Sequence, residues 1–407
     1  MKHTVVIGGG ASGMAAAIAA AEQGAPVTLI EKKEQLGKKL QVTGNGHCNF
    51  TNRDMSVSHY HCDDVAFITD CLNAFTPEDA ADFFRKLGML SHERNGYYYP
   101  LSEQAVTVVR TLKMRLEELK VRVLTGTDVW RVRKLPNGRF EIVSDKGTFN
   151  ASEVILACGS EASVKDSRPF SGYRILQDFG LMVEPPFPVL VPLYGREGYE
   201  SYWDGVRHIC TLRTEYGAQE TGEVQFTKKG ISGIPVFQLS HDIIQRIREK
   251  GECTLYADFL PGIEEVVLHA HLRTYGHRNL DAVLCGLLPA KLGFVISKKA
   301  GVSASIPSGE ISSMQVKRLL KALKSFEYKV TGFGDMADAQ ASAGGLSLKE
   351  ISKGCEVKTV PGLFVTGEML NVDGDCGGYN LHFAFATGLV AGHAAGIYGK
   401  HIPEAER

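Results

Sequence analysis

The sequence predicts an α/β protein in which a parallel-sheet domain carries an antiparallel meander and is interrupted by a second, inserted domain. Three observations lead to this class. The first 31 residues read as strand, glycine turn, helix and strand; residues 128–150 alternate with period two between turn signals; and a proline-rich break at 185–188 opens a region of different pattern.

The N-terminal segment predicts a Rossmann-like domain. Two apolar runs, 4–7 and 27–30, flank an alanine-rich helical stretch and a G-x-G-x-x-G turn at Gly8, Gly10 and Gly13. Gly8 permits the tight turn, Gly10 lets backbone amides approach a pyrophosphate, and Gly13 lets helix and strand pack closely. The helix N-terminus favours phosphates. Glu31, at about the expected 20-residue spacing, can accept hydrogen bonds from ribose hydroxyls.

The rest of the first domain follows in order. Residues 41–52 form a polar, glycine-rich loop, residues 64–90 are helical with a start at Thr76, and residues 102–120 form a long amphipathic helix. Strands at 121–124, 128–134, 139–144 and 147–150 make the meander, and a buried strand at 154–157 runs into a small-residue turn.

The domain boundaries are placed from the composition break and the returning strands. We expect a first segment of the dinucleotide-binding domain at 1–190, an inserted domain at 191–325 with a helical part near 262–300, and a second segment of the first domain at 326–407.

Three features favour FAD held in place over NAD used transiently. The chain has one fingerprint, at its N-terminus, and the crossover beyond it is a meander rather than a second α/β half. Near the C-terminus, a strand at 363–366 leads through Gly367-Glu368 and a glycine-rich turn into a helix at 380–398. Glu368 can accept from ribityl hydroxyls, and the helix N-terminus can place positive potential beside the flavin. NAD(P)H would then be a transient electron donor.

Composition argues against several other classes. Lys and Arg number 45 against 46 Asp and Glu, which gives no electrostatic case for a nucleic-acid partner. The sequence shows neither an apolar run of about 18 residues nor a leader pattern. The nine cysteines are scattered without C-x-x-C. We expect a cytoplasmic enzyme with a small-molecule substrate, no metal, no nucleic acid and no membrane partner.

The sequence resembles the bacterial flavoproteins that include aminoacetone oxidase-like and BaiN-like members, within the two-dinucleotide-binding-domain group. The segments that carry the resemblance are GGGASGMAAA (8–17), TGNGHCNFTN (43–52), YYYPLSEQA (97–105), LACGS (156–160), ASAGGLSLKEI (341–351) and LFVTGEMLNVDGDCGGYNLHFAFATG (363–388). It implies a discontinuous FAD domain interrupted by a barrel-like insert with a helical subdomain. The family's Trp-Thr is replaced here by Asp375-Cys376, at a position that borders the expected substrate side.

The resemblance also implies FAD-binding residues. Those for the pyrophosphate and adenosine half are Gly8, Gly10, Ala11, Ser12, Gly13, Glu31, Lys32, Val129, Ala157, Cys158 and Gly159. Those toward the ribityl chain and flavin are Lys39, Gly44, Asn45, Gly46, Cys48, Asn49, Gly367, Glu368, Gly378, Asn380 and Leu381.

For catalysis, the candidate residues are His47, Cys48 and His382. Each also fits a packing or wall role. The expected function is an FAD-dependent oxidoreductase that transfers hydride between flavin N5 and a small organic substrate or NAD(P)H. Two alternatives stay open: a flavin-dependent amine oxidase that uses oxygen, and a non-catalytic flavin-binding or RNA-associated protein.

Overall fold

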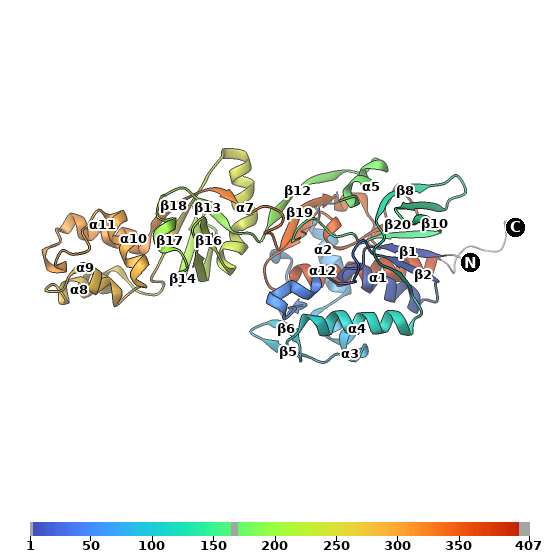
Figure 1. Cartoon of the computed structure of the whole chain (residues 1–407), viewed down its shortest axis with the longest axis horizontal. Helices are drawn as coiled ribbons and strands as arrows, with labels where there is room; N and C mark the ends of the chain where they lie inside the picture. Colours follow the sequence, from blue (N-terminus) through green and yellow to red (C-terminus); the bar gives the residue numbers. More distant parts are fainter. Residues whose placement is uncertain (1–2, 164–169, 399–407) are drawn as a thin grey trace. The chain divides into compact units, whose positions relative to one another are not determined.

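The computed structural model describes residues 3–163 and 170–398, and the chain forms two compact units (Figure 1). Unit 1 comprises Met1–Phe187 and Gln340–Arg407, and unit 2 comprises Pro188–Ala339. The break near the proline-rich segment lies close to the expected residue 190. The return to unit 1 comes at Gln340 instead of residue 326.

The centre of unit 1 is a parallel sheet, which confirms the predicted Rossmann-like class. Its strand order is β20-β11-β1-β2-β7, and all four neighbouring pairs are parallel. Every residue of β1, β2, β11 and β20 is buried, as continuous apolar runs in such sheets require. The strands are β1 (Thr4–Ile7), β2 (Val27–Ile30), β7 (Arg122–Leu124), β11 (Glu153–Leu156) and β20 (Leu363–Val365).

Two helices from opposite ends of the chain pack face to face in this unit. Helix α1 (Ala11–Glu22) lies against α12 (Tyr379–Tyr398). A Cβ at Gly388 would lie 2.3 Å from the carbonyl oxygen of Ser12, and one at Gly392 would lie 2.2 Å from that of Ala16. Small residues on both helices therefore bring the two backbones into contact, which places the middle of α12 beside the start of α1.

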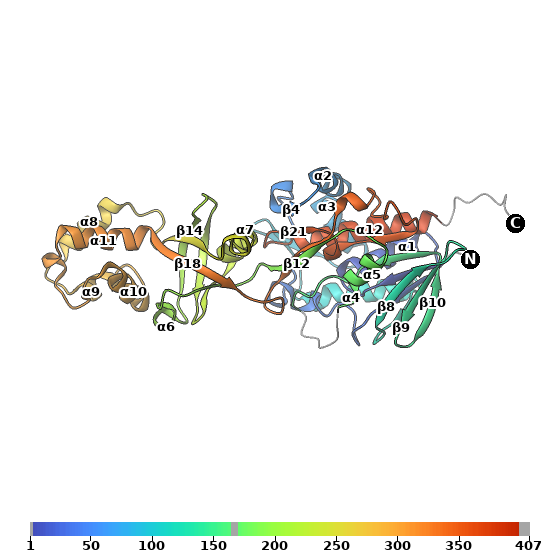
Figure 2. The same ribbon diagram turned by 90° about the horizontal axis from the view of Figure 1, so that it is seen from above.

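One sequence expectation for unit 1 is confirmed and another needs correction. Thr76 caps a new helix with Pro77 in its first turn, as expected, so residues 64–90 contain two helices. Strand β7 pairs in parallel with β2, so it extends the central sheet and only β8, β9 and β10 form the meander (Figure 2). The remaining helices and strands are α2 (Val65–Ala74), α3 (Pro77–Lys86), α4 (Ala105–Glu118), α5 (Gly172–Asp178), β3 (Thr51–Asn52), β4 (Tyr60–Cys62), β5 (Ser91–Arg94), β6 (Tyr97–Pro100), β8 (Val129–Lys134), β9 (Phe140–Ser144), β10 (Gly147–Ala151), β12 (Val183–Val189), β19 (Ala341–Leu346) and β21 (Val372–Gly374).

Unit 2 is a closed barrel with helices. The barrel order is β13-β16-β15-β14-β17-β18. Strand β18 begins at the expected residue 326, but it pairs with β13 and β17 and so completes the barrel instead of returning to unit 1. The helical part contains α8 to α11. The elements are β13 (Leu193–Gly195), α6 (Glu200–Trp203), β14 (Arg207–Thr214), β15 (Gln219–Phe226), β16 (Gly230–Ser232), α7 (Ile234–Lys250), β17 (Cys253–Asp258), α8 (Glu265–Thr274), α9 (Leu280–Cys285), α10 (Ala290–Ala300), α11 (Ser313–Lys324) and β18 (Phe326–Phe333).

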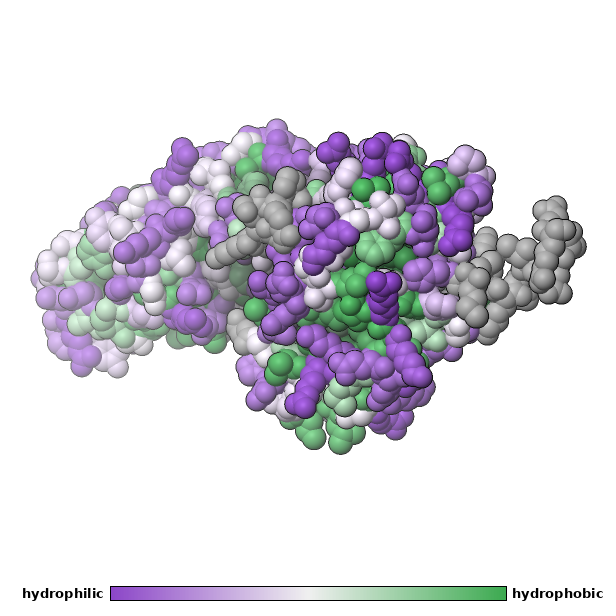
Figure 3. Space-filling model, turned by 45° about the vertical axis from the view of Figure 1, so that its right-hand side comes forward, coloured by the Kyte–Doolittle hydropathy of each residue, from purple (hydrophilic) through white to green (hydrophobic). Residues whose placement is uncertain are grey.

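The surface mixes hydrophilic and apolar residues, as the face drawn in Figure 3 illustrates. Among the described residues, none of the helices combines the length and the apolar character needed to cross a membrane.

Candidate FAD site and its C-terminal glycine turn

Four loops that carry predicted site residues leave the same edge of the central sheet. Strands β1, β2, β11 and β20 run parallel and end at Ile7, Ile30, Leu156 and Val365. Ligands of open α/β sheets bind outside the carboxyl ends of the strands. The loops that follow hold Gly8 to Gly13, Glu31 and Lys32, Ala157 to Gly159, and Gly367 with Glu368, so the fold brings these predicted residues together.

The first loop has the geometry of a phosphate-binding turn. A Cβ at Gly13 would lie 1.8 Å from the carbonyl oxygen of Gly8, so only glycine permits this approach of helix to strand. A Cβ at Gly10, by contrast, would meet no atom within 4 Å. Helix α1 has neither a side-chain N-cap nor an acid in its first turn. Its first N–H groups, including those of Ala11 and Ser12, can therefore bind an anion.

Hydrogen bonds to the carboxylate of Glu31 hold the loop after β2 in place. The carboxylate of Glu31 accepts hydrogen bonds from the N–H groups of Gly9, at 2.6 Å, and Lys33, at 2.7 Å. Lys32 forms an ion pair of 3.3 Å with Asp128, which precedes the buried Val129 at the start of β8. Glu31 thus stands at the glycine loop, where the ribose was expected.

The two ends of the chain meet at Glu368. Its Oε2 atom lies 2.7 Å from the Nζ atom of Lys39, and its Oε1 atom accepts from the N–H of Ser342. A Cβ at the neighbouring Gly367 would lie 2.8 Å from the Oγ atom of Ser12, so this loop lies against the first turn of α1.

The polar loop at 41–52 is more regular than its composition predicts. Residues Leu40–Gly46, which include Gly44 and Asn45, form a 3-10 helix. Cys48 has a φ of 57° and is completely buried, and its burial raises the pKa of the thiol to about 12. Asn49 lies beside Gly378, because a Cβ there would be 2.9 Å from the Oδ1 atom of Asn49.

Unpaired polar atoms and open backbone positions in these loops fit a bound FAD. The buried Oδ1 atom of Asn49 and the buried Oγ1 atom of Thr366 have no hydrogen-bond partner among the described residues. Such orphaned polar groups are costly unless a ligand or water satisfies them. Added Cβ atoms at Gly10, Gly46 and Gly159 would each meet open space. Open backbone and unpaired polar atoms on these loops are what an extended dinucleotide requires.

A second glycine-rich segment, residues 374–378, is called here the C-terminal glycine turn. The side-chain amide of Asn380 bonds both the N–H and the carbonyl of Gly374, at 2.9 and 2.7 Å. The amide of Asn52 donates to the carbonyl of Gly377 at 3.0 Å. The side chain of Asn380 is therefore a brace of the turn, and Gly378 and Leu381 lie at the N-terminal end of α12.

The three residues predicted to be catalytic are not an acid–base set. His382 is completely buried; its Nε2 atom bonds the carbonyl of Phe75 and its Nδ1 atom bonds the hydroxyl of Thr51, both at 2.8 Å. Burial lowers the pKa of His382 to about 4, so the ring is a neutral structural residue. His47 is half-exposed and bonds the carbonyl of Glu103 at 2.9 Å. The protonated, buried thiol of Cys48 is a packing group.

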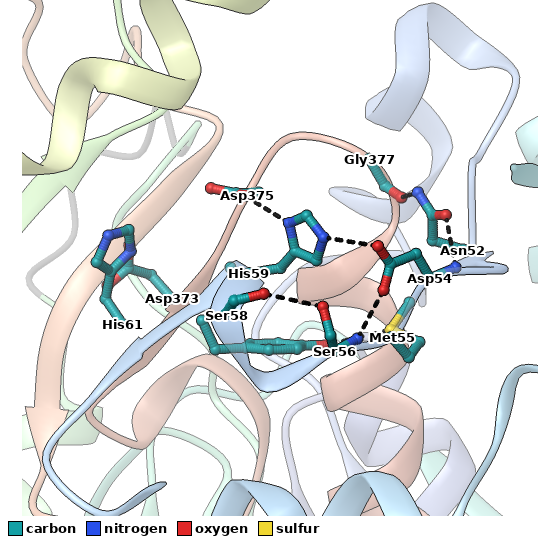
Figure 4. A network of polar contacts seen from close by, with 12 residues as sticks. Asn52, Asp54, Met55, Ser56, Ser58, His59, His61, Asp373, Asp375 and Gly377 are labelled. Atoms are coloured by element: carbon teal, nitrogen blue, oxygen red, sulfur yellow. Dashed lines mark hydrogen bonds and ion pairs between the residues drawn. The ribbon is translucent and has the colours of Figure 1, made fainter. Parts of the chain in front are cut away.

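The structure adds a group that sequence reasoning missed. His59 lies under the C-terminal glycine turn, with its Nδ1 atom 2.8 Å from Asp375 and its Nε2 atom 3.3 Å from Asp54 (Figure 4). Burial disfavours the charged ring, yet the hydrogen bonds to Asp375 and Asp54 outweigh it and raise the pKa of His59. Burial also raises the pKa of Asp375, against the opposing effect of His59. No local motif marks His59, because Asp375 is 316 residues away.

Comparisons with known proteins identify the family of the chain. The family model described as HI0933-like protein Rossmann domain matches residues 2–394. A 3-dehydro-bile acid delta(4,6)-reductase of Clostridium scindens is 37% identical over 97% of this chain and 99% of its own. A ribosomal RNA dihydrouridine synthase of Haemophilus influenzae is 29% identical over 95% of this chain and 96% of its own.

A solved structure supports the fold. The 3-ketosteroid delta1-dehydrogenase of Sterolibacterium denitrificans, in complex with 1,4-androstadiene-3,17-dione, has a TM-score of 0.52. It shares 13% identity, and the similarity covers 98% of this chain and all of that one. The chain belongs to the HI0933-like Rossmann-domain family, and it is an FAD-dependent oxidoreductase.

Proposed function

We propose that the protein is a reductase that adds hydrogen across a carbon–carbon double bond conjugated with a carbonyl group in a small organic substrate, with NAD(P)H as reductant. The observation that carries the flavin chemistry of this proposal is the meeting of an N-terminal and a C-terminal segment at one sheet edge, where Lys39 pairs with Glu368. The direction of reaction is supported by the two relatives, because both of their names denote saturation of a carbon–carbon double bond.

Different residues of the chain bind different parts of FAD. The N-terminus of α1 holds the pyrophosphate, Glu31 holds the adenosine ribose, and Glu368 faces the ribityl chain. The C-terminal glycine turn and the start of α12 border the flavin, where the helix dipole favours negative charge. FAD, when bound, supplies hydride transfer at its N5 atom. The unpaired side-chain oxygens of Asn49 and Thr366 would form hydrogen bonds with the bound cofactor.

The rival from the same class is an amine oxidase that uses oxygen. Anaerobic stopped-flow separates the two. The FAD-loaded protein is mixed with NADH, with NADPH and with a panel of primary amines, and the flavin absorbance near 450 nm is followed. We expect bleaching by a reduced nicotinamide and not by the amines. Bleaching by an amine alone, followed by fast reoxidation in air, would establish the oxidase instead.

One observation favours a second candidate function, reduction of a base in RNA. The helical part of unit 2, residues 264–324, has nine Lys or Arg against four Asp or Glu, although the whole chain is neutral. Arg273, Arg278, Lys317, Arg318 and Lys321 are exposed, and none of them pairs with an acid within residues 3–163 and 170–398. Arg278 also lies 4.7 Å from the ring of Tyr275. The expectation that the protein binds no nucleic acid rested on the net charge of the whole chain. That near-zero net charge does not reveal the local excess of basic residues in the helical part.

The salt dependence of binding tests the second candidate. Filter binding of labelled ribosomal RNA is measured for the wild-type protein and for the K317E/R318E/K321E variant. An RNA-directed enzyme binds with a steep salt slope, and the triple variant loses about three units of that slope. The control K228E/K229E changes two exposed lysines outside the helical part. Equal binding by both variants would remove this candidate.

A further inference from the structure

The group formed by Asp54, His59 and Asp375 has no assigned role in the binding of FAD. The three side chains form a chain of hydrogen bonds, Asp54 to His59 Nε2 at 3.3 Å and His59 Nδ1 to Asp375 at 2.8 Å (Figure 4). They come from three places in the sequence. Asp54 follows β3, His59 ends the 3-10 helix Val57–His59, and Asp375 belongs to the C-terminal glycine turn.

Solvent exposure falls along this chain of groups. The side chain of Asp54 is 67% exposed, that of His59 is 27% exposed and that of Asp375 is 21% exposed. A proton can therefore enter from water at one end and reach a half-buried carboxyl at the other. The ring of His59 is held in place by stacking on Tyr379, with 4.4 Å between ring centroids.

The inner end lies where substrate chemistry is expected. The backbone N–H of Asp375 donates to the carbonyl of His59 at 2.9 Å, so the turn and the histidine are joined by both backbone and side chain. Asn52 secures the other limb of the turn at Gly377. Asp375 belongs to the same turn as Gly378, which lies beside the unpaired Oδ1 atom of Asn49, and both of these residues are expected to border the flavin.

We propose that Asp54, His59 and Asp375 form a proton relay from solvent to the substrate, with Asp375 as the residue that protonates it. This proposal rests on the proposed reductase function. The substrate accepts hydride, with its electron pair, at the carbon far from the carbonyl, and the π electrons of the double bond move toward the carbonyl oxygen. The O–H bond of Asp375 breaks, and its proton forms the new C–H bond next to the carbonyl. The resulting carboxylate recovers a proton from His59, and His59 recovers one from water by way of Asp54.

The electrostatics agree with this direction of transfer. Hydrogen bonds from Ser56 and His59 lower the pKa of Asp54, whereas burial raises the pKa of Asp375. The inner carboxyl therefore holds a proton more readily than the outer one. The other titratable groups that face the relay are His61 and Tyr60 on β4, Asp373 on β21, Cys376 in the turn itself and Tyr379 at the start of α12.

The kinetic test separates the two half-reactions. Flavin bleaching by NAD(P)H and its anaerobic reoxidation by cyclohex-2-enone or a 4-en-3-one steroid are timed for wild type, D375N and H59N. Reoxidation is expected to slow by about 10-fold or more in both variants, within the range of general acid catalysis, while bleaching changes less than about 2-fold. The wild-type reoxidation rate falls as pH rises, and D375N loses this dependence. The control H92N removes a similar histidine, which lies 2.7 Å from Glu103.

The titration of His59 tests the relay independently of catalytic activity. The imidazole of His59 is titrated by NMR in the oxidised, FAD-loaded protein. Its midpoint is expected to lie above 6.5 and to fall in D375N but not in H92N. An enone that never reoxidises the wild-type flavin would defeat the reductase proposal alone. The relay would be overturned by an unchanged reoxidation rate in D375N. It would also be overturned if the titration midpoint of His59 were the same in D375N as in the wild-type protein.

Discussion

The ammonium group of Lys39 lies 2.7 Å from the Oε2 atom of Glu368, and this ion pair joins the loop after β2 to the loop after β20. Both side chains are partly buried, so solvent screens the pair less than an exposed one. The pair therefore couples the N-terminal and C-terminal halves of the FAD site.

A double-mutant cycle measures this coupling. K39A and E368A are each expected to weaken FAD binding by about 10-fold, and the double variant is expected to bind no worse than the weaker single variant. The coupling energy should be about 1.4 kcal/mol, the equivalent of one tenfold loss, as for contacting residues in one network. FAD titration of the apoprotein by fluorescence quenching supplies the dissociation constants. Strictly additive losses would show that the two residues act separately.

Two glycines of the first loop should respond differently to alanine. In G13A the new methyl group collides with the carbonyl of Gly8, so the apoprotein should lose several kcal/mol of stability. In G10A the methyl group enters open space, so thermal stability should be kept and FAD affinity should fall. G286A serves as control, because its Cβ meets its nearest atom at an ordinary 3.4 Å. Unimpaired FAD binding by G10A would argue against a pyrophosphate at this loop.

The buried His382 should make the protein less stable in acid. Its pKa is about 4 in the folded protein and 6.5 in a model peptide, so the unfolded state binds the proton first as the pH falls. Stability is therefore lost between about pH 6.5 and 4, by up to about 3 kcal/mol. Urea unfolding of wild type and H382N at several pH values isolates this contribution, since the variant should show a smaller slope. Parallel pH profiles for the two proteins would mean that His382 titrates normally.

Cysteine reactivity should follow burial and not the expected proximity to the flavin. Cys285 is exposed, whereas Cys48 is completely buried with a pKa raised by burial to about 12. Iodoacetamide at pH 8 is expected to label Cys285 within minutes and to leave Cys48 unlabelled in the native protein. Peptide mass spectrometry reads both sites. Rapid labelling of Cys48 would restore it as a candidate redox group.

Local pattern predicts the parts of this protein whose structure is set by neighbours in sequence. The strand-turn-helix-strand segment at the N-terminus is one such part, because its periodicity and glycine spacing are contained in about 30 residues. Helix α7 was missed, although a glycine precedes it, a proline lies in its first turn and Gly251 ends it. The pairing of β18 within the barrel depends on partners far along the chain.

The same limit applies to the site. The residues of the four sheet-edge loops could be assigned because each follows a recognisable strand. His59 could not be assigned, because its role depends on contacts with Asp375 and Tyr379, more than 300 residues away. His382 was assigned wrongly, since a histidine near a glycine turn gives no sign of whether a backbone carbonyl already holds its ring.

The oxidative half-reaction tests whether the protein reduces a carbon–carbon double bond conjugated with a carbonyl group. The FAD-loaded wild-type protein is reduced with NAD(P)H without oxygen and then mixed with an α,β-unsaturated ketone, and the return of flavin absorbance is timed against an equal concentration of the saturated ketone. The reductase account predicts reoxidation by the unsaturated ketone alone, with one saturated product formed for each flavin reoxidised. A flavin that stays reduced with every unsaturated ketone and returns only with oxygen would contradict it.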